Sequence, residues 1–281
     1  MSDIDYLKKV SSQVRRDIIR MIHGAASGHP GGSLGACDYL VALYMDIMDH
    51  KPDSFSMDGK GEDIFVLSNG HLSAAIYSVL ARSGYFSTDE LGSFRELGTR
   101  LQGHPGTDKG LPGIRVATGS LGQGLSVAVG AALSKKINGD HKKVFCLMGD
   151  GELQEGQVWE AVMFAAANKV DNLIAAVDYN GKQIDGSLDD VLPLGDLQAK
   201  WESFGWKVLV AEGNNMEDVI KTTRKAIAHT DRGIPHVILL QTEMGKGVDF
   251  MEGTHKWHGV APNDDEAARA LAQLDETLGD Y

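Results

Sequence analysis

The chain has 281 residues, which could hold one large α/β domain or two small ones, and its 42% apolar content is enough for a substantial core. A formal net charge of −12 argues against nucleic acid or an anionic membrane surface as a partner. No apolar run approaches the roughly 18 residues that a membrane span needs, and residues 1–10 lack the apolar core of a secretory signal. We therefore expect a cytoplasmic protein with Cys37 and Cys146 as buried free thiols.

Helical and strand patterns alternate along the chain. Apolar spacing predicts helices at 6–26 and 34–48, a third capped by 69–71 and running to about 82, and one at 119–137, with strands at 64–67, 144–148, 173–177, 206–210 and 236–242. Residues 84–118 are Gly-rich and irregular, as expected of active-site loops. This order predicts one doubly wound, mostly parallel sheet with helices on both faces, formed by residues 1–260. Residues 261–281 are expected to be a short, exposed acidic tail with one short helix.

Two strand ends each offer one oxygen ligand, Asp150 and Asn180. Residues 155–168 between them have helical spacing, so the unit is βαβ, and open parallel sheets bind ligands beyond the carboxyl ends of their strands. Gly149 and Gly151 permit a tight turn, and the N-terminus of the following helix favours an anion. A hard divalent cation that carries a diphosphate suits these groups best. Mg²⁺ usually takes few protein ligands, the rest being phosphate and water.

Four histidines lie in Gly-rich loops: His29, His71, His104 and His255. Flanking Gly or Pro holds such backbone open to a ligand. An imidazole there can donate to a diphosphate or a sugar oxygen, or move protons near neutral pH. Zinc ligation is the competing interpretation. His255 and His258 are the nearest approach to a metal pair, and no Cys-x-x-Cys or His-x-x-x-His pair supports them.

The Gly-Asp-Gly motif at 149–151 together with Asn180 resembles the thiamine-diphosphate motif, and the longer string 149–161, with 178–180 and 184–186 after it, resembles transketolase specifically. The likeness covers roughly residues 10–260. It implies a diphosphate-binding domain for thiamine diphosphate. It also implies Mg²⁺, with Ca²⁺ or Mn²⁺ as substitutes, held by Asp150, Asn180 and the backbone carbonyl of Lys182.

The resemblance also implies roles for the histidine loops. His71 and His255 would contact the diphosphate side, whereas His29 and His104 would lie near the reactive thiazolium carbon and the sugar hydroxyls. His255 would reach the substrate as well, and His258 matches the second histidine of a His-x-x-His stretch in the family.

The segment 118–124 matches a part of the family that approaches the pyrimidine ring and the diphosphate, which implies Gly119, Ser120 and Leu121 as cofactor-binding residues. Ser120 stands where many members carry proline, a change that affects loop stiffness more than chemistry.

Glu155 and Glu160 admit two interpretations. Placement near the start of a helix is favourable for an acid, by about 0.3–1 kcal/mol each. By resemblance, such acids lie at the contact between active sites and relay protons, so Glu155 is a candidate catalytic residue.

In transketolases a second α/β domain grips the pyrimidine end of the cofactor through a glutamate and supplies arginines for the sugar phosphate. This chain is filled by one sheet, so we expect a partner subunit that carries the pyrimidine-binding and C-terminal domains. The resemblance then implies an α2β2 enzyme of the pentose phosphate pathway. It would transfer a two-carbon ketol unit from a ketose phosphate to an aldose phosphate.

Two alternatives remain from the sequence. The chain could be the α subunit of another thiamine-diphosphate enzyme, such as a 2-oxo acid dehydrogenase, although those are not expected to carry all four histidine loops. It could also be an inactive scaffolding subunit. Intact candidate ligands at Asp150 and Asn180 disfavour that.

Overall fold

The computed structural model describes residues 3–281 and contains a parallel five-stranded sheet. Its strands are β1 (Ile64–Leu67), β2 (Val144–Gly149), β3 (Leu173–Tyr179), β6 (Lys207–Glu212) and β7 (His236–Gln241). Their order across the sheet is β1-β2-β3-β7-β6, and all four neighbouring pairs run parallel. The five strands expected from the sequence are thereby confirmed, and all their carboxyl ends meet at one edge.

Each central strand is buried on both faces, which explains its continuous apolar run. Alternate residues of β2 point to opposite sides. Phe145 and Leu147 belong to one core cluster, and Cys146 and Met148 to the other. Both cysteines of the chain are buried and free, as expected.

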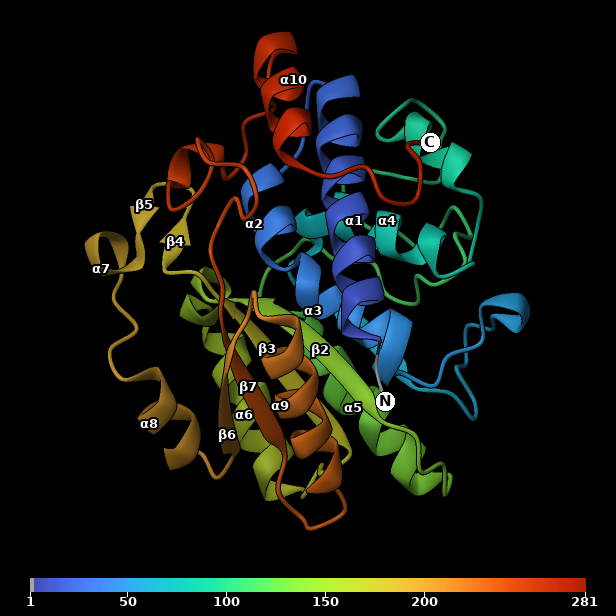
Figure 1. Cartoon of the computed structure of the whole chain (residues 1–281). Helices are drawn as coiled ribbons and strands as arrows, with labels where there is room; N and C mark the ends of the chain where they lie inside the picture. Colours follow the sequence, from blue (N-terminus) through green and yellow to red (C-terminus); the bar gives the residue numbers. More distant parts are fainter. Residues whose placement is uncertain (1–2) are drawn as a thin grey trace.

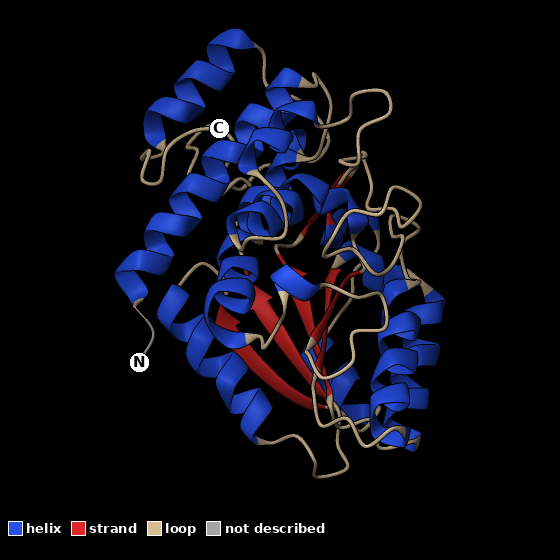
Figure 2. Ribbon diagram, turned by 90° about the vertical axis from the view of Figure 1, so that its right-hand side faces the viewer, coloured by secondary structure: helices blue, strands red, loops and turns tan. Residues whose placement is uncertain are grey.

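Helices cover both faces of the sheet (Figures 1 and 2). The first core cluster is closed by α1 (Ile4–Gly24), α2 (Pro30–Gly35), α3 (Cys37–Ala42), α4 (Ser73–Arg82) and α9 (Met216–Ala228). The second is closed by α5 (Gly124–Ile137), α6 (Gly156–Ala167) and α8 (Leu197–Ser203). The doubly wound fold predicted from the sequence is confirmed.

Two expected helices differ in detail. The helix expected at 34–48 is three pieces, in which α2 and α3 meet at Ala36 and a π-helical turn follows at Leu43–Ile47. The helix expected at 119–137 begins only at Gly124, because Gly119 and Gly122 have φ angles of +133° and +83°, which no helix accommodates. The residues before Gly124 are therefore free to form a loop beside the sheet edge.

Short elements complete the chain. They are 3-10 turns at Pro52–Ser54, Gly70–Leu72, Thr88–Ser93, Gly151–Gln154 and His255–Trp257, the hairpin β4 (Lys182–Gln183) and β5 (Gly186–Ser187), α7 (Leu188–Val191) and α10 (Asp264–Gln273). Within residues 3–281, no helix is both long and apolar enough to cross a membrane.

The C-terminal segment carries the expected short helix, α10, but it packs against α1 instead of extending into solvent (Figure 1). Asn263 and Glu266 form a capping box at the start of α10. Beyond the helix, the Asp280 carboxylate accepts hydrogen bonds from Arg16 at 2.7 and 2.9 Å. Most of the segment is exposed, as expected, but it is held against α1, because its last acidic residue finds a cationic partner there.

Candidate active site

A cavity of about 310 Å³ lies at the carboxyl edge of the sheet. It is lined by His29, Gly32, Asn69, His71, Leu72, Leu121, Gly149, Asp150, Gly151, Glu152, Gln154, Glu155, Asp178, Asn180, Lys182, Gln183, Ile184, Met244 and His258. Most of these residues follow β1, β2, β3 or β7, or lie close to the start of a helix that packs on the sheet. The fold thus brings together residues that are more than 200 positions apart in the sequence.

Asp150 lies directly after β2 and is only 2% exposed. One carboxylate oxygen accepts from the backbone N–H of Gly151 at 2.7 Å, and the other from that of Gly181 at 2.6 Å. Burial, reinforced by the neighbouring Asp178 carboxylate, raises the pKa of Asp150 to about 7. Two buried acids so close together form a site that a divalent cation would neutralise.

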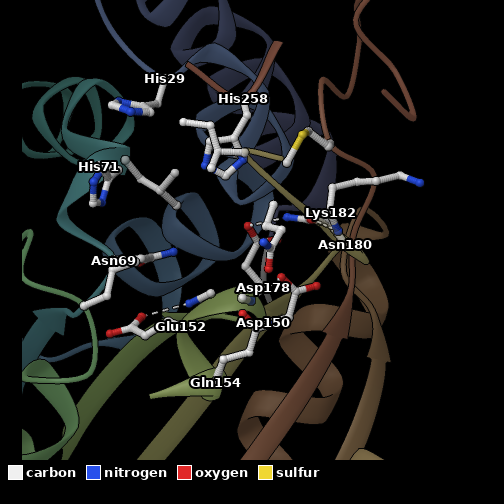
Figure 3. Close-up of a pocket in the computed structure, with 18 of the residues that line it drawn as sticks. His29, Asn69, His71, Asp150, Glu152, Gln154, Asp178, Asn180, Lys182 and His258 are labelled. Atoms are coloured by element: carbon white, nitrogen blue, oxygen red, sulfur yellow. Dashed lines mark hydrogen bonds between the residues drawn. The ribbon is translucent and has the colours of Figure 1, made fainter. Parts of the chain in front are cut away.

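Asn180 follows β3, and Asp178 fixes its orientation (Figure 3). The Asn180 Nδ2 donates to Asp178 Oδ2 at 3.1 Å, while Asn180 Oδ1 accepts from the Lys182 N–H at 2.9 Å. Asp178 is itself held by the Thr242 hydroxyl, which follows β7. The Lys182 side chain extends away from Asp150 in Figure 3, which leaves its backbone as the part of Lys182 nearest the acids.

Four imidazoles gather together, those of His29, His71, His104 and His258. All but His104 line the cavity with these acids, and His104 packs behind His71 and His29. The His29 ring centroid lies 4.9 Å from that of His71 and 6.1 Å from that of His258, and those of His71 and His104 are 4.6 Å apart. His29 is positioned by α2, which begins at Pro30, and His71 by the 3-10 turn after β1. We call these four residues the histidine cluster.

The surroundings of the histidine cluster lower the pKa of each of its four imidazoles. Burial, followed by the repulsion of His71 and His258, lowers the pKa of His29 to about 3. Burial and then His104 lower the pKa of His71 to about 4. Burial also lowers the pKa of His104 and that of His258. Neutral imidazoles can each donate one hydrogen bond and accept another.

Gly119, Ser120 and Leu121 form the loop before α5. Leu121 lines the cavity, whereas Ser120 is exposed and is not part of the lining. Gly119 has φ +133°, and a Cβ there would lie 2.6 Å from His104 Cδ2, so glycine permits the close packing of this loop on His104. Glu155 lines the cavity from the start of α6 and is solvent-exposed.

The structure places His255 and His258 differently. Both belong to one short segment, a 3-10 turn that begins at His255 and is capped at His258. His258 lines the cavity and joins the histidine cluster, but His255 does not line it. The resemblance assigns the site role to His255. In the structure it is His258, at the other end of this short turn, that lines the cavity.

Three buried polar residues escaped the sequence prediction: Asn69, Glu152 and Asp178. All three line the cavity and are at most 7% exposed. Asp178 and Glu152 lie within the segments that resemble transketolase, but their burial depends on contacts with Thr242 and Ser68, which lie far away in the chain. The sequence feature that could have identified these three residues is their position at or just after the ends of β1, β2 and β3, which lie at one edge of the sheet.

The donor set fits a metal-bound diphosphate. Asn69 Oδ1, His29 Nδ1 and His258 Nδ1 are buried without a hydrogen-bond partner among residues 3–281, which a native site rarely tolerates unless a ligand or water completes it. In the same part of the chain, no group of three or more His, Cys, Asp or Glu side chains could hold a metal ion. The candidate metal ligands are instead one carboxylate, one amide and one carbonyl.

Residues 7–277 match the family described as "Transketolase, thiamine diphosphate binding domain". The chain is 38% identical to an apulose-4-phosphate transketolase subunit of Phocaeicola vulgatus, over 98% of this chain and 96% of that protein. It is also 38% identical to a 6-deoxy-6-sulfo-D-fructose transketolase subunit of Clostridium sp., over 96% of both.

Among solved structures, the transketolase of Campylobacter jejuni superposes with a TM-score of 0.90 at 33% identity. That alignment covers 100% of this chain and 44% of the Campylobacter protein. The chain therefore spans almost all of the two subunit relatives but less than half of this longer transketolase.

Proposed function

This chain belongs to the transketolase family, and from that premise we propose that it is the diphosphate-binding subunit of a two-chain transketolase. The enzyme would transfer a two-carbon ketol unit from a ketose phosphate to an aldose phosphate. The observation that carries the proposal is the cavity that Asp150 and Asn180 line together with His29, His71 and His258. Family membership favours ketol transfer over the decarboxylation performed by 2-oxo acid dehydrogenases.

The residues that would hold the cofactor are those at the strand ends. We assign Asp150, Asn180 and the Lys182 carbonyl to Mg²⁺, for which Mn²⁺ or Ca²⁺ could substitute, because oxygen ligands suit hard cations. Gly149 and Gly151 keep the backbone around Asp150 free of side chains. When bound, thiamine diphosphate supplies the nucleophilic carbon that carries the ketol unit.

The histidine cluster would act on the sugar and on the diphosphate. His71, nearest the end of β1, and the unpartnered Nδ1 of His258 are suited to donate to phosphate oxygens. We assign to His29 and His104 the binding of sugar hydroxyls or the acceptance and return of a proton, because a neutral imidazole can do either. We keep His255 as a substrate contact and Glu155 as a proton relay, both as proposals.

The proposed partner carries the pyrimidine-binding and C-terminal transketolase domains. Support comes from the relatives of matching length, whose names describe them as transketolase subunits. An α2β2 assembly would place two such pairs together.

We further propose residues 1–260 as the cofactor domain and 261–281 as a segment that reinforces α1. The sugar could resemble those of the relatives, a ketose 4-phosphate or a sulfonated ketose.

A coupled assay tests this function. The chain alone should bind thiamine diphosphate weakly and show no ketol transfer, whereas the chain mixed with its partner should transfer ketol units between sugar phosphates. Decarboxylation of a 2-oxo acid with an artificial acceptor, in place of ketol transfer, would refute the proposal. Strong turnover by the isolated chain would refute the two-chain arrangement.

A further inference from the structure

Glu152 is a buried carboxylate that the proposed chemistry does not use. It lies in the 3-10 turn after Asp150 and is 2% exposed. Its Oε1 accepts from the Ser68 hydroxyl and from the Gly122 N–H, the latter at 2.8 Å, and its Oε2 accepts from the Gly149 N–H at 3.1 Å. Figure 3 shows it below Asn69, on the cavity wall.

These three donors belong to three separate segments of the site. Ser68 follows β1 and precedes Asn69 and the turn that carries His71. Gly122 belongs to the loop before α5, and Gly149 is the last residue of β2 before Asp150. One carboxylate thus joins the end of β1, the loop before α5 and the end of β2.

Ser68 links Glu152 to the start of α5. Its Oγ accepts from the Gly124 N–H at 3.1 Å, so it is simultaneously a donor to Glu152 and an acceptor from the first residue of α5. A Cβ on Gly124 would collide with the Ser68 side chain and backbone, which shows how closely the two segments approach. The chain Glu152–Ser68–Gly124 therefore sets where α5 starts relative to β1.

A negative charge beside a diphosphate site needs a physical reason. Burial raises the pKa of Glu152, which shows that the surroundings oppose its ionised form, and the hydrogen bonds from Ser68, Gly122 and Gly149 oppose that rise. The ionised carboxylate is the side chain whose two oxygens can accept from all three donors without offering a donor in return. The amide of glutamine has the same shape but would turn an N–H₂ toward at least one N–H.

We propose that Glu152 is a positioning residue that holds the β1 end, the Gly122 loop and the β2 end in the arrangement that binds the diphosphate. It acts through these segments and does not need to touch the cofactor. The identity of the ligand, a diphosphate, rests on the proposed function. The positioning role itself rests on the hydrogen bonds of Glu152.

The test compares Glu152→Gln, Ser68→Ala and the double variant in the full chain. In the cofactor-free protein, hydrogen exchange of peptides covering 119–125 and 148–152 should accelerate about tenfold or more in Glu152→Gln, with that of β3 and β7 unchanged. With the partner subunit and Mg²⁺, calorimetry should show thiamine-diphosphate affinity about 10- to 100-fold lower, the cost of leaving a buried donor unpaired. Turnover at saturating cofactor should change less than about threefold, because no contact to the reacting atoms is lost.

Ser68→Ala should lose part of the affinity, and the double variant should lose little more than Glu152→Gln alone, since both residues act as one unit. Glu202→Gln is the matched control. Glu202 is an exposed acid of α8 that accepts a hydrogen bond from Gln198, and its replacement should change neither the hydrogen exchange nor the cofactor affinity. If exchange is unchanged in Glu152→Gln, or if the two affinity losses add in full, the positioning role is refuted.

The two proposals fail separately. If the unmodified assembly binds no thiamine diphosphate, the proposed function fails while the exchange experiment still decides the role of Glu152. Should Glu152→Gln not fold, Ser68→Ala decides alone, because it removes one donor and leaves the carboxylate in place. Unchanged exchange at 119–125 in that variant would then contradict the inference.

Discussion

His29 lies among three other imidazoles, and its environment determines what it can do. A histidine with an unperturbed pKa near 6.5 would change its charge within the physiological range. In this site, burial and neighbouring rings lower the pKa of His29 to about 3 and that of His71 to about 4. The two rings therefore stay neutral through the pH range in which the protein would work.

This neutrality can be measured in the cofactor-free protein. Imidazole ¹⁵N and ¹³C shifts should show no titration of His29 or His71 between about pH 5 and 8. Because a lowered folded pKa means that the unfolded chain binds protons more readily, both residues reduce stability as pH falls below about 6.5. A titration of either ring near that pH would contradict the burial described here.

His104 offers a second test at the same scale. It is solvent-exposed, packs against Gly119 and His71, and is not among the residues that line the cavity. His104→Ala should lower turnover by about 10²-fold or more, as for loss of a group that positions or protonates substrate, with cofactor affinity changed less than about fivefold. The reverse pattern, in kinetics and calorimetry, would place His104 at the diphosphate.

Residue types and spacing predicted part of this site. Asp150, Asn180, His29 and His71 were expected together, and they line one cavity because each follows a strand or precedes a helix at the same edge. The position of His258 in the cavity wall could not be predicted. It depends on how the 3-10 turn His255–Trp257 packs against α2.

At the scale of elements, α1 is the centre of the helical layer. It contacts α2, α3, α4, α9 and α10. The buried Asp17 on α1 accepts from Ser78 and Arg82 on α4, with Arg82 nitrogens at 2.5 and 2.8 Å from its carboxylate. Arg82 also donates to the Gly279 carbonyl, which ties the C-terminal segment to the same pair.

Removing Arg82 should therefore cost much stability. Arg82→Met leaves the fully buried Asp17 carboxylate with one hydroxyl partner, and we expect a loss of about 3–5 kcal/mol in the free energy of unfolding. Arg100→Met breaks a partly exposed pair with Glu90 and should cost less than about 1 kcal/mol. Urea denaturation measures both, and equal losses would show that the Asp17 pair contributes no more than a surface pair.

The elements themselves were largely readable from the sequence, since fully buried strands appear as continuous apolar runs. The delayed start of α5 was not readable. Residues 119–123 did not interrupt the predicted helix in the sequence pattern, but Gly122 donates to Glu152 and is held outside it. A contact between distant segments overrode the local pattern.

On the scale of the whole molecule, the sheet brings together cavity-lining residues from distant parts of the chain. His29 lies near one end of the sequence and His258 near the other, yet their rings are 6.1 Å apart. The doubly wound fold could be predicted because strand and helix patterns alternate. The docking of residues 261–281 on α1 could not, because it depends on ion pairs such as Arg16–Asp280 that no local pattern reveals.

The central claim is that Asp150 and Asn180 hold the cation that carries the diphosphate. A crystal structure of the chain with its partner, thiamine diphosphate and Mn²⁺ in place of Mg²⁺ tests it through the anomalous signal of the metal. The account predicts the ion in contact with one Asp150 oxygen, the Asn180 side-chain oxygen and the Lys182 carbonyl, with diphosphate oxygens completing its coordination. An ion and diphosphate bound elsewhere, with Asp150 still bonded to the Gly151 and Gly181 amides alone, would contradict it.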